Sequence, residues 1–202
     1  MPMQIALRPF CLHQSGSTSH RVVMPHSLQD TIALLERTPG ALDALLRGLP
    51  EAWTQQNEGE GTFTAFDVVG HLIYADKEDW IPRARKILEH GETVPFDPFD
   101  RWGHLAQCRG KTLAQLLDEF AQVRSQSLDA LRSLHLQPDQ LALKGKHPAL
   151  GAVTLSELLA TWAAHDLTHL HQVSRIMANQ YRDEVGPFAA FLGVMKCNGH
   201  GG

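Results

Sequence analysis

Apolar residues recur at intervals of three and four along most of the chain, the spacing that gathers them on one side of an α-helix. This pattern predicts four long amphipathic helices, and the alternation of apolar and polar residues that is typical of β-strands is not evident. A shorter amphipathic segment near the C-terminus is expected to form a small helix. The four helices are expected at residues 28–49, 64–90, 112–134 and 154–180, and the short one at residues 185–195.

Hydroxyl side chains stand at three of the expected helix starts. Ser27 and Thr112 can each accept a hydrogen bond from the first turn of the helix that follows. Thr154 is followed three residues later by Glu157, which is the spacing of a capping box. These caps support the predicted boundaries.

Proline and glycine interrupt two of the helices and mark the connections between them. Pro39 and Gly40 either kink the first helix or divide it in two, and Pro82 is expected to distort the second. Segments rich in proline, glycine and polar residues are expected to be loops, at residues 50–62, 91–110 and 135–153.

The second of these connections carries three aromatic residues, Phe96, Phe99 and Trp102. Two interpretations of these rings are open. Either the connection folds back over the bundle and the rings wall a pocket, or the rings are simply buried beneath a loop.

Four amphipathic helices with two connections of roughly twenty residues are typical of a helix bundle with crossovers. The expected fold is therefore all-α: a four-helix bundle with two long crossover connections and a short C-terminal helix. Residues 1–27 are expected to be a poorly ordered N-terminal arm, residues 28–196 the bundle domain, and residues 197–202 a frayed tail.

Composition excludes several classes of partner. The chain has 18 basic and 22 acidic side chains, a net charge of -4, and no basic run suited to phosphates, so nucleic acid is not expected as a partner. No apolar stretch approaches the roughly 18 residues needed to span a bilayer, so no membrane role is expected. Cys11, Cys108 and Cys197 are far apart and lack C-x-x-C spacing, which indicates neither a disulfide framework nor a sulfur metal site. A reducing, cytoplasmic location is the simplest expectation.

The candidate chemistry lies in the fourth predicted helix, where His165 and His169 are four residues apart. On a helix this spacing leaves two side chains about 40° apart and about 6 Å along the axis, so both imidazoles can bind one ion. His171 lies about 200° round the helix from His169 and is assigned to a different face.

Two histidines leave such a site incomplete, because catalytic zinc sites usually have three protein ligands and one open position. The third ligand must come from elsewhere in the chain. His71, in the second predicted helix, has Val68 and Leu72 close to its side of the helix. Taken alone, it is better explained as a core histidine that forms a hydrogen bond.

Two segments resemble the DinB-like superfamily of metalloprotein four-helix bundles. They are DVVGHLI at residues 67–73 and AHDLTHLHQ at residues 164–172, and the likeness extends over residues 28–195. The resemblance implies a homodimer, and a small-molecule substrate or a low-molecular-weight thiol as partner. The ligands that it implies for one divalent metal ion, nickel or zinc, are His71, His165 and His169.

Asp166 and Gln172 are the candidate catalytic residues beside these histidines. Asp166 falls in the apolar arc of its helix, where a carboxylate needs a partner, so it is expected to orient an imidazole or to meet an arginine of another helix. Gln172 returns to the histidine stripe one turn after His169 and can contact a water on the ion. A purely structural role is the alternative for both residues.

Three functions remain open at this point. The first is a metal-dependent thiol transferase that acts on a small molecule, as some members of the resembling superfamily are. The second is a zinc hydrolase that uses the HDLTH segment, which resembles the H-E-x-x-H pattern with Asp166 in place of glutamate, and Glu184 as a candidate ligand. The third is a non-enzymatic, stress-associated metal-binding dimer. A di-iron bundle is excluded because no Glu-x-x-His pair occurs.

Overall fold

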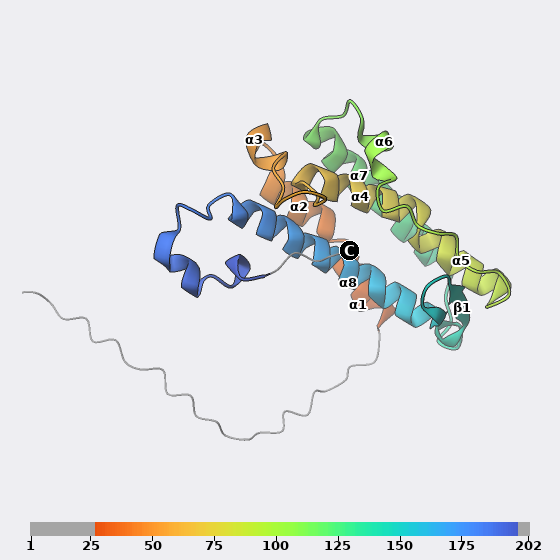
Figure 1. Ribbon diagram of the computed structural model, residues 1–202. Helices are drawn as coiled ribbons and strands as arrows, with labels where there is room; N and C mark the ends of the chain where they lie inside the picture. The colour runs from red at the N-terminus through yellow and green to blue at the C-terminus, as the bar shows by residue number, and fades with distance from the viewer. Residues whose placement is uncertain (1–26, 198–202) are drawn as a thin grey trace, which may run out of the picture.

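The computed structural model describes residues 27–197 and confirms the four-helix bundle (Figure 1). Two of its four long elements consist of two successive helices each, and the other two are single helices. The elements are α1 (Leu28–Leu35) with α2 (Thr38–Leu46), α4 (Ala65–Glu78) with α5 (Trp80–His90), α7 (Leu113–Ser133), and α8 (Leu155–Asn179). The predicted arm apart from Ser27, and the predicted tail apart from Cys197, lie outside the described residues.

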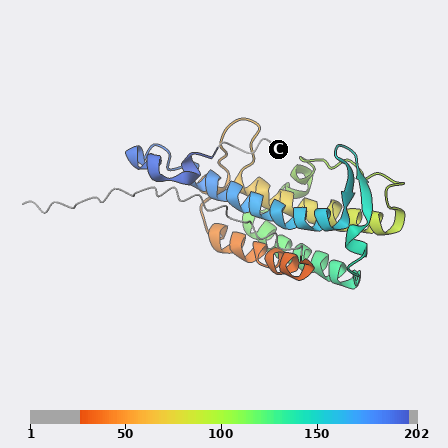
Figure 2. The same cartoon turned by 90° about the horizontal axis from the view of Figure 1, so that it is seen from below.

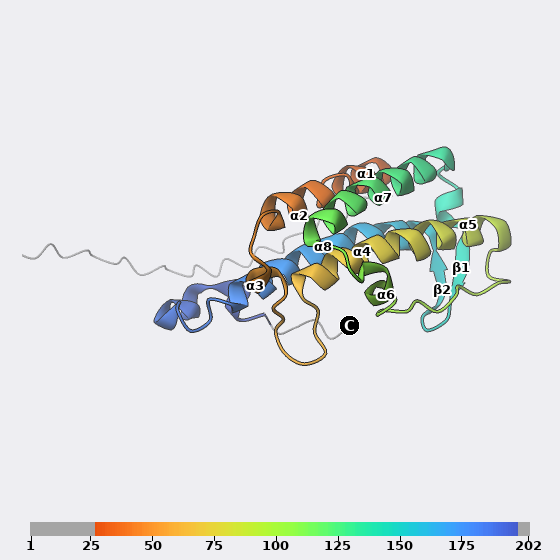
Figure 3. The same cartoon turned by 90° about the horizontal axis from the view of Figure 1, so that it is seen from above.

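The directions of the four elements explain the long connection that follows α5. The pair α1 and α2 runs parallel to α8, whereas α4, α5 and α7 run the opposite way (Figures 1 and 3). The long helices α5 and α7 run in the same direction, so the chain that joins them, from His90 to Leu113, has to run back along the bundle. The short helix α6 (His104–Cys108) lies in this returning connection and packs against α4.

Both predicted proline effects are observed as helix breaks. Pro39 lies in the first turn of α2, where a missing N–H costs no helical hydrogen bond, so the predicted first helix is divided in two. Pro82 lacks the N–H that would bond to the carbonyl of Glu78, and α4 ends at that residue. Asp79 stands between α4 and α5 with φ -112° and ψ -69°.

Three helices begin with capping boxes, in which a threonine and the residue three positions later each accept the other's backbone N–H. The pairs are Thr64 with Asp67, Thr112 with Gln115, and Thr154 with Glu157. Ser27 accepts a hydrogen bond from the N–H of Asp30 at 3.2 Å. The three caps predicted from the sequence are therefore confirmed.

The all-α bundle is accompanied by one small hairpin, which the sequence pattern did not indicate. β1 (Lys144–His147) and β2 (Gly151–Thr154) form an antiparallel hairpin in which Lys144 lies opposite Thr154. Each strand has only 4 residues, most of them exposed or partly buried, so neither shows the alternation by which strands are recognised. Figure 2 shows the hairpin at one end of the bundle, and β1 packs against α5.

Three further short segments also differ from the predicted elements. Within the predicted connections lie a single turn, α3 (Glu51–Thr54), and a 3₁₀ helix, η1 (Gln140–Ala142). The predicted C-terminal helix is instead a pair of 3₁₀ helices, η2 (Gly186–Phe191) and η3 (Gly193–Met195). Glycines and a proline in this segment disfavour a continuous α-helix, and Phe191 is 86% exposed.

Buried apolar residues form two clusters along the bundle, and Arg124 of α7 lies where they meet. Its guanidinium faces the ring of Phe120, from one cluster, at 4.9 Å and that of Trp162, from the other, at 5.4 Å. Arg124 is only 1% exposed. A charge at this depth requires charged or hydrogen-bonding partners.

Hydrogen bonds from Arg124 join α7 to the other three elements of the bundle. Nε and Nη2 donate to the carboxylate of Asp76, in α4, at 2.7 and 3.0 Å. Nη2 also donates to Asp166, in α8, at 3.0 Å, and Nη1 donates to the carbonyl of Leu35, in α1, at 2.9 Å. Although burial opposes its charge, the two carboxylates raise the pKa of Arg124. This network ties the helices together at one level of the bundle.

The longest helix, α8, has 25 residues but carries histidines and charged residues along its length. Among residues 27–197, no helix is both long and apolar enough to cross a lipid bilayer.

Candidate metal centre

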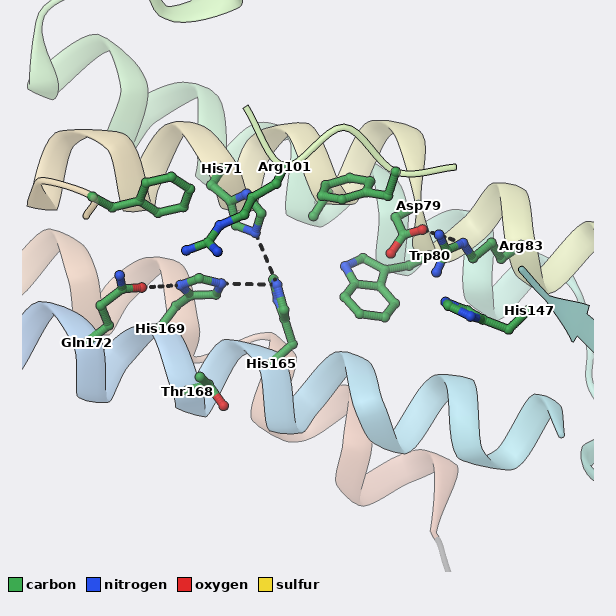
Figure 4. Close-up of a pocket in the computed structure, with 13 residues that line it drawn as sticks. His71, Asp79, Trp80, Arg83, Arg101, His147, His165, Thr168, His169 and Gln172 are labelled. Atoms are coloured by element: carbon green, nitrogen blue, oxygen red, sulfur yellow. Dashed lines mark hydrogen bonds and ion pairs between the residues drawn. The ribbon is translucent and has the colours of Figure 1, made fainter. Parts of the chain in front are cut away.

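A cavity of about 470 Å³ lies between α4, α5 and α8, beneath the connection that follows α5 (Figure 4). His71 enters it from α4, and His165 and His169 enter from α8 on the opposite side. His147 of the hairpin lines the end that lies near α5. The cavity therefore collects imidazoles from three elements, of which α4 is far in the sequence from β1 and α8.

The three histidines named by the resemblance converge on one point in this cavity. The Nε2 atom of His165 lies 3.2 Å from Nε2 of His71 and 3.1 Å from Nε2 of His169. One ligand nitrogen from each ring lies within 4.8 Å of the other two. Among the described residues, this is the one group of three or more potential ligands that is close enough to hold an ion.

The geometry of two helices produces this convergence. On α8, the four-residue spacing stacks His165 and His169 on the same face, with ring centroids 4.3 Å apart. On α4, which runs antiparallel to α8, His71 is buried and its ring centroid lies 4.8 Å from that of His169. The pair His165 and His169, predicted from its spacing, thus faces a third imidazole. The packing of α4 against α8 brings this third ring to the pair.

A hydrogen bond orients the ring of His169. Its Nδ1 lies 2.8 Å from Oε1 of Gln172, and an amide oxygen only accepts, so in the neutral ring Nδ1 donates and Nε2 presents its lone pair to the other two histidines. Nε2 of His165 has one in-plane position, which holds either a proton or a lone pair, so it makes at most one well-aligned hydrogen bond to its two close neighbours. A cation bound among the three rings would accept a lone pair from each of them.

The pKa values of two of the rings favour the neutral, ligand-competent form. Burial, with help from His169, lowers the pKa of His71 to about 3, and the backbone of Arg101 offsets part of this shift. Burial also lowers the pKa of His165 to about 2, with His169 and His71 acting in the same direction. Both rings are consequently neutral at pH 7 and do not need to lose a proton before they bind an ion.

Asp166, a candidate catalytic residue, lies outside the cavity. It is 2% exposed, and its carboxylate pairs with Arg124 instead of with the histidines. This is the second of the two arrangements expected for it, the one in which it meets an arginine of another helix. Gln172, the other candidate, lines the cavity and contacts His169 directly.

His171 and Glu184 do not line the cavity. For His171 this agrees with the expected separation from His169 round the helix. Glu184 is exposed and follows the end of α8, so it does not approach the three histidines.

Five polar cavity residues were not identified as site residues from the sequence: the charged residues Asp79, Arg83 and Arg101, together with His147 and Thr168. Asp79 and Arg83 form an ion pair at 2.5 Å. Burial raises the pKa of Asp79 to about 6, although Arg83 pulls it down. Their four-residue spacing was a detectable signal of pairing, but nothing local indicated that the pair faces the histidines.

The sequence left two interpretations open for the aromatic residues of the connection, walls of a pocket or simple burial beneath a loop. The structure shows an example of each. Phe99 lines the cavity and packs its ring edge-on against His71, with centroids 5.6 Å apart. Phe96 is 2% exposed and belongs to an apolar cluster, so it is simply buried. Trp102 is 41% exposed and packs edge-on against Phe63, which itself lines the cavity.

The family model described as the DinB superfamily matches residues 34–173. The chain belongs to the DinB superfamily. A search of curated proteins found no match for this DinB-superfamily chain.

Among solved structures, the chain is similar in fold to YfiT from Bacillus subtilis. The TM-score is 0.66 and the sequence identity 18%, and the match covers 81% of this chain and 93% of YfiT. YfiT is described as a probable metal-dependent hydrolase with an unusual four-helix bundle topology. At this identity, the likeness concerns the fold of the DinB-superfamily chain.

Proposed function

We propose that this DinB-superfamily protein is a metal-dependent enzyme that transfers a low-molecular-weight thiol to or from a small molecule. The observation that carries the proposal is the approach of three Nε2 atoms, from His71, His165 and His169, at the wall of a cavity of about 470 Å³. Neutral imidazoles suit zinc, nickel, copper and iron, and we favour nickel or zinc. An ion held by three imidazoles keeps an open position, where it supplies Lewis acidity to a thiol or a carbonyl.

The adjoining cavity favours a catalytic over a structural role for the ion. Structural sites are usually closed by four protein ligands, whereas three histidines beside a cavity leave room for a small molecule. A non-enzymatic metal-binding dimer would have no need of this space. The homodimer remains part of the proposal, and sedimentation of the metal-loaded protein tests it.

The chain's own residues supply proton transfer and exclusion of water. Asp79, with a pKa of about 6, can hold or release a proton near neutral pH, and its ion pair with Arg83 fixes its position. Phe63 and Phe99 pack against His71, at ring centroid distances of 5.4 and 5.6 Å, and screen it from solvent. A protected, partly apolar cavity keeps a thiolate reactive and limits competing hydrolysis.

Hydrolysis is the second candidate, because YfiT is described as a probable metal-dependent hydrolase. In this chain the carboxylate that lines the cavity, Asp79, is the candidate base. The version that uses Asp166 as the base of an H-E-x-x-H-like segment is not supported, because Arg124 holds that carboxylate away from the histidines.

Metal content is the first test. Tag-free wild-type protein is expected to bind about one zinc or nickel ion per chain, measured by elemental analysis after loading and gel filtration. His71→Ala is expected to lose most of the ion, while His90→Ala, a change at an exposed histidine outside the cavity, retains it. Full stoichiometry in the His71→Ala protein would contradict the assignment.

Turnover is the second test. The loaded protein is incubated with thiols and electrophiles in pairs, and separately with esters and amides, and products are identified by mass spectrometry. Thiol conjugation that disappears on chelation and returns with the ion supports transfer. Hydrolysis without conjugation would favour the second candidate instead. Chelation that abolishes folding, with no turnover of any substrate, would support a structural ion.

A further inference from the structure

Arg101 is a cavity residue that the proposed function does not yet use. It belongs to the connection that folds back from α5, and Figure 4 shows it reaching toward the three histidines. Its guanidinium carbon lies 5.1 Å from the ring centroid of Phe63 and 5.8 Å from that of Trp102. Two rings therefore hold this cation in place at the edge of the candidate metal centre.

The side chain of Arg101 lines the same cavity as the three imidazoles and reaches toward them (Figure 4). A cation so near an ion site would be unfavourable unless an anion lies between the two positive charges. The arrangement is therefore suited to a ligand that bears negative charge.

The other charged groups of the cavity are already paired. Asp79 and Arg83 neutralise each other at 2.5 Å. Within residues 27–197, the guanidinium of Arg101 has neither an ion-pair partner nor a side-chain hydrogen bond, although it is only partly exposed. A guanidinium offers five donors in a planar fork that matches a carboxylate, so its free donors face the cavity ready for one.

We propose that Arg101 binds a carboxylate of the substrate, so that the thiol or its acceptor is an acidic small molecule whose other end reaches the ion. This inference rests on the proposed function and names the substrate class of the same site. Arg101 then sets specificity and orientation, because one contact at the ion and a second at the guanidinium define the pose of a short molecule.

The test uses two probes that differ only in charge, 3-mercaptopropionate and 3-mercaptopropionamide. Both are titrated into cobalt-loaded full-length protein, and the thiolate-to-cobalt absorption band reports binding. The wild type is expected to bind the acid about 10- to 100-fold more tightly than the amide, the range of a charge-assisted hydrogen-bonded pair. In Arg101→Gln this preference is expected to fall below about threefold, with amide binding unchanged.

Two further variants complete the design. Arg101→Lys keeps the charge without the fork and should retain part of the preference, so it carries the test if the glutamine variant does not fold. Arg109→Gln removes an exposed arginine of the same connection that does not line the cavity, and it should bind both probes as the wild type does.

Each contrary outcome overturns a different statement. Equal binding of both probes by the wild type, or an acid preference that persists in Arg101→Gln because the carboxylate chelates the cobalt, overturns the role of Arg101 and leaves the metal centre standing. If cobalt loads but neither probe binds, both the role of Arg101 and thiol transfer are overturned. If no cobalt loads in the wild type, the metal centre falls, and this inference falls with it.

Discussion

The guanidinium of Arg124 holds the carboxylate of Asp166 on one side of α8, while the neighbouring His165 points into the cavity on another. Adjacent residues on a helix differ by about 100° in direction, so one turn of α8 serves two purposes. His165 contributes to the candidate metal centre, and Asp166 anchors the helix to α7. The ion-pair network thereby fixes the helix that presents two of the three imidazoles.

Loss of Arg124 is expected to destabilise the fold severely. Arg124→Met leaves the carboxylates of Asp76 and Asp166 buried without their partner, which costs about 3 to 5 kcal/mol in the free energy of unfolding. Urea denaturation followed by circular dichroism measures the loss.

A combined variant serves as the control for this prediction. Arg124→Met together with Asp76→Asn and Asp166→Asn removes all three charges, and it is expected to be more stable than Arg124→Met alone. If the combined variant is less stable than the single one, the destabilisation arises from lost packing and not from unpaired charge.

Gln172 is expected to tune metal affinity through His169. Gln172→Leu removes the acceptor that holds Nδ1–H of His169, so metal affinity should fall about 10- to 100-fold. Competition with a chromophoric chelator measures the change. Gln172→Glu keeps an acceptor at the same place and should recover most of the affinity, whereas equal affinities in the wild type and the leucine variant would exclude an orienting role.

The stability of the metal-free protein is expected to fall at acidic pH because of His165. Burial lowers its folded-state pKa from 6.5 to about 2. Below pH 6.5 the unfolded chain therefore binds a proton that the folded protein excludes, so stability is fully present above this pH and decreases as the pH falls toward 2. The contribution reaches about 1.4 kcal/mol per pH unit.

His165→Gln isolates this effect, because glutamine does not titrate. Urea denaturation of both metal-free proteins between pH 4 and 8 should give curves that converge or cross as the pH falls, with the wild type losing stability more steeply. Parallel curves would show that His165 titrates normally in the folded state.

Two glycines in helices are expected to respond to the same substitution in opposite ways. At Gly70, in α4 beside His71, a Cβ would overlap the sulfur of Cys108, so Gly70→Ala should cost about 1 to 3 kcal/mol and disturb the position of α6. At Gly40, in α2, a Cβ meets nothing within 4 Å, so Gly40→Ala should add about 0.5 to 1 kcal/mol. Thermal denaturation distinguishes the two signs, and stabilisation by Gly70→Ala would contradict the packing described for α6.

Interactions between near neighbours in the chain were predictable. The four long helical elements, the caps at Thr112 and Thr154, and the breaks near Pro39 and Pro82 depend on groups a few residues apart, and all of these appear in the structure. The hairpin was missed because its strands are short and its stability comes from pairing and from contacts with α5. Such contacts between distant segments cannot be predicted from the local pattern of apolar residues.

In the candidate site, too, contacts between near neighbours in the chain were predictable and contacts between distant segments were not. The sequence by itself determined the pair His165 and His169, because a separation of four residues on a helix specifies their relative position. Only the tertiary structure decided that α4 lies antiparallel to α8 and brings His71 to them, and that Asp166 turns to Arg124 instead. The tertiary structure also decided that the long connection after α5 brings Arg101 to the cavity. The physical reason is that helical periodicity is a property of a few adjacent residues, whereas these contacts depend on how whole helices and connections pack.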